Sequence, residues 1–141
     1  MFFKKLFPSP KKFSRHKVLI VDDNEVDRKL IARTLDKMGC VVLTAVDGEI
    51  GLHLALSEKP DLILSDCQMP HMDGLTMCKE LRENEETRDI PVIFLTGDSS
   101  PAMVVDCFDM VNVDNYMCKP INAKILIGQI EDILNEHLPK K

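Results

Sequence analysis

The stretch Lys17-Val-Leu-Ile-Val-Asp-Asp23 indicates the fold of the chain. Four aliphatic residues follow Lys17, and the run ends abruptly in Asp22 and Asp23. A short, continuous apolar run bounded by polar residues is typical of a strand that is buried on both faces, as in a parallel sheet covered by helices. Four similar runs follow, so we expect five strands. The later runs are residues 41–45, 62–65, 91–96 and 113–117.

Segments with apolar residues at helical spacing follow each of these runs. The first segment ends at Gly39, where a left-handed helix cap prefers glycine. Its apolar residues are Val26, Leu30, Ile31, Leu35 and Met38. We expect four more helices: residues 48–57, one from Gly74, one from Ser99 with Pro101 in its first turn, and one over 125–134. This strict alternation predicts an α/β fold with a doubly wound, five-stranded parallel sheet and five helices.

The charge of the 141-residue chain is unevenly distributed. The net charge is -5, but residues 1–17 hold six basic side chains and no acid, which leaves -11 for residues 18–141. Nucleic acids are bound mainly through clustered Lys and Arg. We therefore expect no nucleic-acid partner for this acidic body.

Residues 1–15 are predicted to be a basic, aromatic and flexible arm in front of a single domain at 16–138, with a short tail at 139–141. Four apolar side chains of the arm share one helical face beside Lys4 and Lys5: Phe2, Phe3, Leu6 and Phe7. Membrane-surface helices have this pattern. A flexible tail, a membrane-surface helix and a partner-docking peptide all stay open. The short tail leads us to expect no output domain on this chain.

The cysteines and the hydropathy indicate a cytoplasmic protein. The five cysteines are odd in number and form no C-x-x-C pair, so the sequence predicts reduced thiols and neither a disulfide framework nor a zinc site. No run of about 18 apolar residues predicts a membrane span. The first residues are too short and too soon interrupted by Pro8 and Pro10 to be a secretory signal.

Polar residues that suit one kind of chemistry end the predicted strands: Asp22 and Asp23, Asp66, Thr96 and Lys119. In a doubly wound sheet these ends meet at the ligand-binding edge. Two carboxylates about 4 Å apart repel each other by roughly 4 kcal/mol at an effective dielectric constant of about 20, so a cation is required. Hard oxygen ligands with room for water suit Mg²⁺, and Mn²⁺ is an alternative.

The same set of residues predicts phosphoryl transfer. Lys119 and Thr96, together with the metal, supply positive charge and a hydroxyl donor for the equatorial oxygens of a transferring phosphoryl group. Asp66 is then the acceptor, because an ionised carboxylate is a competent nucleophile without a neighbouring base. Gly97 leaves space for the incoming group.

Four stretches carry a resemblance to a known family: residues 18–24, residues 62–70 with 72–74, residues 93–97, and residues 116–120. In this order and spacing they resemble the receiver domain of two-component response regulators. Single-domain regulators of the chemotaxis type are the most similar in layout. The resemblance covers about residues 16–138 and implies a flavodoxin-like strand order, 2-1-3-4-5.

The resemblance implies roles for the residues at the strand ends. Asp66 takes a phosphoryl group from the phosphohistidine of a histidine kinase or phosphotransfer protein. Asp23, Asp66 and the backbone carbonyl of Gln68 bind Mg²⁺, and Asp22 acts through water. Thr96 and Tyr116 then switch, Thr96 toward the phosphate and Tyr116 inward.

The resemblance also implies how the signal ends and where it goes. The fourth and fifth helices bind a downstream target protein, and Gln68 and Asp98 stand where the family sets its autodephosphorylation rate. The Lys119–Pro120 bond is predicted to be cis. The chain is then a phosphorylated signalling switch with autophosphatase chemistry, and not an enzyme acting on other molecules.

Other functions fit these residues less well. A phosphatase of the haloacid dehalogenase type needs a second acid where Gln68 stands, and an FMN carrier needs a phosphate loop where acids follow the first strand. A pseudo-receiver that serves only as a scaffold is a third alternative. Tyr116 is alternatively plain core, and Cys67 is either an oxidation sensor or, more in keeping with its size, a buried hydrophobe.

Overall fold

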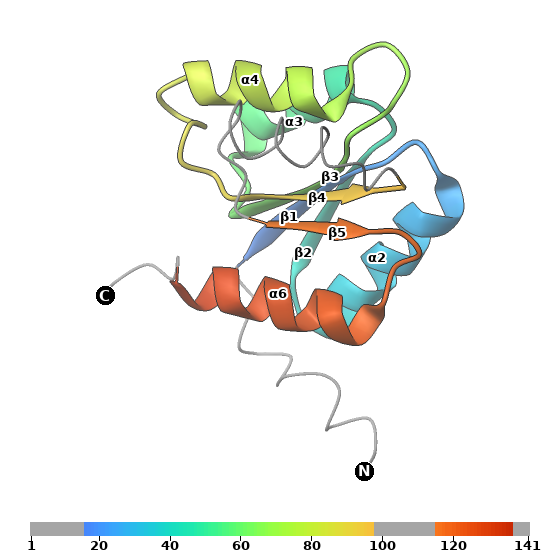
Figure 1. Cartoon of the computed structure of the whole chain (residues 1–141). Helices are drawn as coiled ribbons and strands as arrows, with labels where there is room; N and C mark the ends of the chain where they lie inside the picture. Colours follow the sequence, from blue (N-terminus) through green and yellow to red (C-terminus); the bar gives the residue numbers. More distant parts are fainter. Residues whose placement is uncertain (1–15, 98–114, 137–141) are drawn as a thin grey trace.

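The computed structural model describes residues 16–97 and 115–136 of the chain (Figure 1). These residues form five strands and four helices. The strands are β1 (Lys17–Val21), β2 (Val41–Ala45), β3 (Leu62–Asp66), β4 (Val92–Thr96) and β5 (Asn115–Cys118). The helices are α2 (Glu25–Lys37), α3 (Gly48–Glu58), α4 (Gly74–Glu83) and α6 (Ala123–Glu136). Each observed strand begins and ends within two residues of its predicted limits.

All strand pairs are parallel, and the order across the sheet is β2-β1-β3-β4-β5. The predicted doubly wound sheet and its strand order are therefore confirmed. In Figure 1, α3 and α4 cover one face of the sheet, while α2 and α6 cover the other. The helix predicted from Ser99 lies outside the described residues, as do the arm at 1–15 and the tail.

Alternate residues of β1 supply the two cores. Val18 and Ile20 pack into the core beneath α2 and α6, whereas Leu19 and Val21 pack into the core beneath α3 and α4. Successive side chains of a strand point to opposite faces, so a strand buried on both faces must be apolar throughout. The uninterrupted apolar run of β1 is the consequence of these two cores.

Side-chain caps place the helices against the ends of the strands. The Asn24 side chain accepts a 3.0 Å hydrogen bond from the Asp27 amide at the start of α2, and Asp73 accepts one of 2.7 Å from Thr76 at the start of α4. Each cap satisfies an amide that has no partner within its helix. Gly39 has the predicted left-handed conformation, with φ of 90°.

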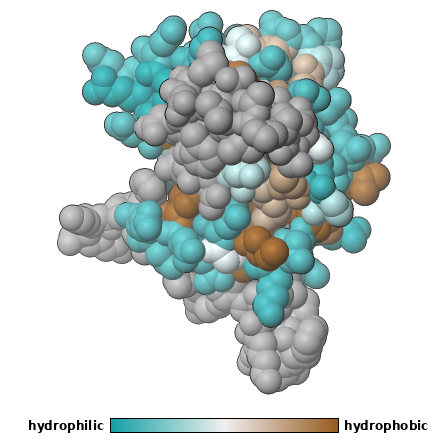
Figure 2. All heavy atoms as spheres, viewed as in Figure 1, coloured by the Kyte–Doolittle hydropathy of each residue, from teal (hydrophilic) through white to brown (hydrophobic). Residues whose placement is uncertain are grey.

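Apolar spacing correctly predicted the four helices of the described residues but overstated how many of their residues are buried. Ile31, Leu35 and Met38 are fully buried, but Val26 at the first turn of α2 is 76% exposed. Ile125, near the start of α6, is 54% exposed. Figure 2 shows the hydrophobic residues of this side of the molecule as small patches among hydrophilic ones. None of the described helices has the length and apolar content needed to cross a membrane.

Candidate functional site

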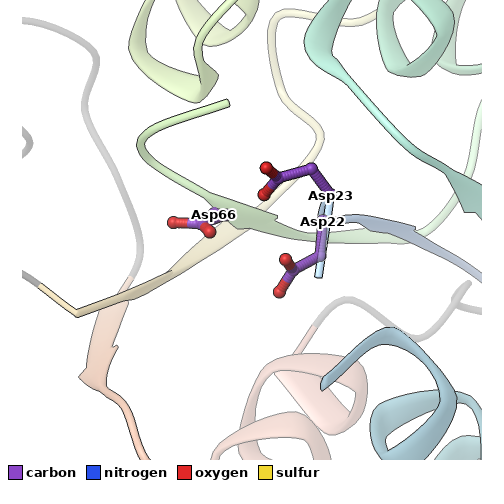
Figure 3. A group of neighbouring side chains, drawn as sticks. All are labelled: Asp22, Asp23 and Asp66. Carbon is purple, nitrogen blue, oxygen red and sulfur yellow. The ribbon is translucent and has the colours of Figure 1, made fainter. Parts of the chain in front are cut away.

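Three aspartates meet at the carboxyl ends of two neighbouring strands. Asp22 and Asp23 follow β1 directly, and Asp66 is the last residue of β3. Figure 3 shows the carboxyl groups of Asp22 and Asp23 facing the side on which Asp66 lies. One carboxylate oxygen from each residue lies within 4.8 Å of the others. The predicted convergence of these three acids is therefore present in the structure.

The three acids differ in their surroundings. Asp22 is fully buried, and its carboxylate accepts a 2.9 Å hydrogen bond from the amide of Asn24. Its backbone carbonyl accepts another from the guanidinium of Arg28, at 2.9 Å. Asp23 is exposed and, among residues 16–97 and 115–136, has no ion pair. The site thus has one rigidly held carboxylate and one that is accessible from solvent.

Lys119 lies among the carboxylates, although it follows β5, which β3 and β4 separate from β1 in the sheet. Its ammonium is 2.9 Å from Asp22 and 3.2 Å from Asp66. Its backbone amide donates a 2.7 Å hydrogen bond to the carbonyl of Thr96, which fixes the lysine beside the end of β4. The Lys119–Pro120 bond is cis, as predicted.

A further partner of Lys119 was missed by the sequence analysis. Asp27, in the first turn of α2, places a carboxylate oxygen 2.9 Å from the same ammonium. The pattern of strand-ending residues could not find it, because Asp27 belongs to a helix. Its place in the first turn after Asp22 and Asp23 was the available signal.

Burial and neighbouring charges shift two pKa values at the site. Burial raises the pKa of Asp66, although the neighbouring Lys119 acts in the opposite direction. Burial would lower the pKa of Lys119, but hydrogen bonds to Asp27 and Asp22 outweigh it, so that pKa is raised. Lys119 therefore stays charged. Asp66 is a more basic carboxylate than an exposed aspartate.

Thr96 and Tyr116 lie on the adjoining strands. Thr96 ends β4, next to β3, and its side chain is buried at 2% exposure. Tyr116 pairs in register with Phe94 and is half-buried against the core beneath α3 and α4. A Cβ atom at Gly97 would meet no described atom within 4 Å. The switching roles of Thr96 and Tyr116 stay predictions.

The residues fit a small divalent cation. Among the described residues, the carboxylates of Asp22, Asp23, Asp27 and Asp66 outnumber the positive groups beside them, the ammonium of Lys119 and the guanidinium of Arg28, which leaves an excess of negative charge. Octahedral Mg²⁺ binds oxygens at about 2.0–2.1 Å and places opposite ligands about 4.2 Å apart. Oxygens that lie within 4.8 Å of one another need only small movements to reach that geometry.

Comparison with known proteins shows which family has this arrangement of strand-end residues. Residues 18–131 match the family model of the response regulator receiver domain. The chain belongs to this family. The receiver domain of this chain is also similar to the chemotaxis protein CheY4 of Vibrio cholerae, with a TM-score of 0.79 and 32% identity over 84% of this chain and 98% of that one. The receiver domain of the Francisella response regulator 1452 gives a TM-score of 0.79 at 27% identity, over 86% of this chain and 98% of that one.

Several curated relatives of the receiver domain are named as transcriptional regulators. The DNA-binding dual master transcriptional regulator RpaA of Synechocystis is 36% identical over 84% of this chain and 48% of its own length. The alkaline phosphatase synthesis regulator PhoP of Bacillus subtilis gives the same figures. The chain spans about half the length of these curated relatives. The receiver-domain resemblance inferred from the sequence is therefore confirmed.

Proposed function

We propose that the receiver domain accepts a phosphoryl group on Asp66 from a phosphohistidine of a histidine kinase or phosphotransfer protein. A carboxylate oxygen of Asp66 attacks phosphorus, the bond from phosphorus to the histidine nitrogen breaks, and the acceptor becomes an aspartyl phosphate. The main evidence for the proposal is the position of Asp66 in the structure. It ends β3 beside two further carboxylates, 3.2 Å from a lysine ammonium.

Each neighbour of Asp66 has a role in this proposal. Lys119 neutralises a phosphoryl oxygen, and Thr96 donates its hydroxyl to another once it turns toward the acceptor. Asp23, Asp66 and the backbone carbonyl of Gln68 hold Mg²⁺, with Asp22 acting through water, and Mn²⁺ is a substitute. When bound, the cation supplies charge neutralisation for the transferring group.

The signal is reversible and is read by another protein. Water attacks the phosphorus of the aspartyl phosphate, the bond from phosphorus to the Asp66 oxygen breaks, and inorganic phosphate leaves. The Asp66 carboxylate is thereby regenerated, so the domain is a switch rather than an enzyme acting on a separate substrate. Tyr116 moves inward with Thr96 and changes the surface near α6, where a target protein binds. The helix expected from Ser99, the other part of that surface, and Asp98 lie outside the described residues.

The partners in this proposal are proteins. DNA binding is stated for RpaA, but the match covers only 48% of that protein. The net charge of -11 on residues 18–141 disfavours a nucleic-acid surface on the receiver domain itself. The proposed kinase and the reduced cysteines are in keeping with a cytoplasmic location.

Phosphorylation of the intact chain by acetyl phosphate tests the proposal and separates it from a scaffold-only role. With Mg²⁺, intact-mass spectrometry is expected to show one added phosphoryl group, which is lost on standing and absent in Asp66→Asn. A matched control is Asp36→Asn, which removes an exposed acid from α2 away from the strand ends. Absence of phosphorylation in the wild type, or phosphorylation that persists in Asp66→Asn, contradicts the proposal.

A further inference from the structure

The ammonium of Lys119 has a carboxylate for each of its N–H groups. A lysine ammonium has three N–H donors and no acceptor. The three carboxylates around it belong to Asp22 at 2.9 Å, Asp27 at 2.9 Å and Asp66 at 3.2 Å. They come from the end of β1, the first turn of α2 and the end of β3. Asp22 and Asp66 accept hydrogen bonds from the ammonium, and Asp27 forms a third ion pair with it, when Asp66 carries no phosphoryl group.

The three carboxylates differ in what their release from Lys119 would cost. The side chain of Asp22 is 1% exposed and that of Asp66 is 12% exposed, whereas that of Asp27 is 23% exposed. A buried carboxylate that loses its partner is strongly destabilised, while an exposed one is resolvated by water. Asp27 is therefore the partner that Lys119 gives up at the lowest cost.

We propose that the ion pair between Asp27 and Lys119 is a latch that favours the unphosphorylated form of the receiver domain. This inference rests on the proposed phosphorylation of Asp66. A phosphoryl group on Asp66 brings new anionic oxygens to the side of Lys119, where they compete with the Asp27 carboxylate for the ammonium. The Asp27 pair breaks, Lys119 turns toward the phosphoryl oxygens, and the Asp27 carboxylate becomes hydrated.

The charge of Asp27 acts in the same direction as the loss of its hydrogen bond. Like charges a few ångströms apart repel each other even near the surface, where water screens them only in part. A carboxylate within hydrogen-bond distance of Lys119 lies close to any phosphoryl group that the lysine binds. Asp27 therefore lowers the affinity of the site for that group both by occupying Lys119 and by repulsion.

Glu25 provides a matched control for Asp27. It lies in the same first turn of α2, so its removal changes the helix dipole interaction similarly. Its carboxylate pairs with Lys29 at 2.8 Å on the exposed surface instead of with Lys119. Neutralising Glu25 thus reproduces the charge change at this turn and leaves the latch intact.

The experiment compares the wild-type chain, Asp27→Asn and Glu25→Gln, each checked for folding by thermal unfolding. Beryllofluoride serves as a mimic of the phosphoryl group at saturating Mg²⁺, and the extent of phosphorylation by acetyl phosphate is measured in parallel. Asp27→Asn is expected to bind beryllofluoride about fivefold more tightly, as expected from a partly buried pair of about 1 kcal/mol. Glu25→Gln is expected to stay within about twofold of the wild type.

A spectroscopic readout separates a latch from a merely structural contact. The side-chain carboxyl ¹³C signal of Asp27 in the wild type is expected to move toward that of a hydrated carboxylate when beryllofluoride is added with Mg²⁺ already present. A signal that does not move, unchanged or weaker binding in Asp27→Asn, or an equal gain in Glu25→Gln overturns the latch alone. A wild-type chain that takes up neither beryllofluoride nor a phosphoryl group overturns the proposed function, and the latch with it.

Discussion

The backbone amide of Gly74 donates a 2.9 Å hydrogen bond to the carbonyl of Cys67, which draws the first turn of α4 against the end of β3. A Cβ atom at Gly74 would overlap the carbonyl oxygen of Asp66. It would also lie 2.9 Å from the hydroxyl of Ser65, which itself donates to that carbonyl. The position of the acceptor backbone thus depends on the absence of a side chain at Gly74.

Gly74→Ala is expected to lower the free energy of unfolding by about 1–3 kcal/mol, since the added methyl must displace backbone. It should also weaken Mg²⁺ binding, because the displaced backbone carries Asp66. Gly128→Ala is the control: Gly128 is an exposed residue within α6, and a Cβ atom there would meet no described atom within 4 Å, so alanine should stabilise the helix by up to about 1 kcal/mol. Urea unfolding measures both, and equal effects would refute the close-approach argument.

Lys119→Met is expected to destabilise the metal-free domain by about 2 kcal/mol, because it leaves the buried Asp22 and Asp66 without their common counter-ion. Mg²⁺ should reduce this loss by supplying positive charge to the same carboxylates. The control is Lys17→Met, whose exposed pair with Glu58 is worth less than about 1 kcal/mol. Unfolding curves with and without Mg²⁺ test the prediction, and a loss that Mg²⁺ leaves unchanged would speak against a shared site.

Asp23→Asn is expected to leave the metal-free domain at least as stable as the wild type, because Asp23 is exposed and its neutralisation relieves repulsion with Asp22 and Asp66. It should nevertheless weaken Mg²⁺ binding by at least about tenfold, since it removes a proposed ligand. The measurement is the rise in melting temperature with Mg²⁺ concentration, which reports binding to the folded state. Asp36→Asn should retain the full rise, and an equal rise in Asp23→Asn would exclude Asp23 as a ligand.

Stability at alkaline pH is expected to depend on Cys40. Burial raises the pKa of this thiol from 9.0 to about 11, and the negative charge of Asp61 adds to the effect. Below pH 9 both folded and unfolded chains keep the proton, so the contribution of the thiol is fully present. Between pH 9 and about 11 only the folded chain keeps it, so the unfolded state is increasingly favoured as the pH rises.

The comparison of the wild type with Cys40→Ala isolates this contribution. In reducing buffer, the stability advantage of the wild type should shrink by about 2 kcal/mol between about pH 8.5 and about pH 10.5. Ser57→Ala removes an exposed hydroxyl that does not titrate in this pH range, so it is the control and should show a nearly constant difference. A constant difference for Cys40→Ala as well would mean that its thiol is not shielded in the folded state.

The strands were predictable because each is marked by a short run of consecutive apolar residues. The run Val18–Val21 is apolar throughout because one core lies on each side of β1. Four consecutive apolar residues can therefore be recognised from the sequence as a strand buried on both faces. Helix ends were predictable for the same reason at Gly39, whose positive φ favours glycine. The exposure of Val26 and Ile125 was not predictable, since helical spacing does not tell which apolar residues the neighbouring elements cover.

The sequence by itself determined the order of strands and helices and the polar residues at the strand ends, including Asp66, because periodicity and chain breaks are properties of short segments. Only the tertiary structure decided how the charges are paired. Lys119 and Asp22 are 97 residues apart, and they meet because the strand order brings the ends of β1, β3 and β5 to one edge of the sheet. Asp27 also pairs with the Lys119 ammonium, because the first turn of α2 packs beside the ends of the strands. The spacing of residues along the chain does not specify that position.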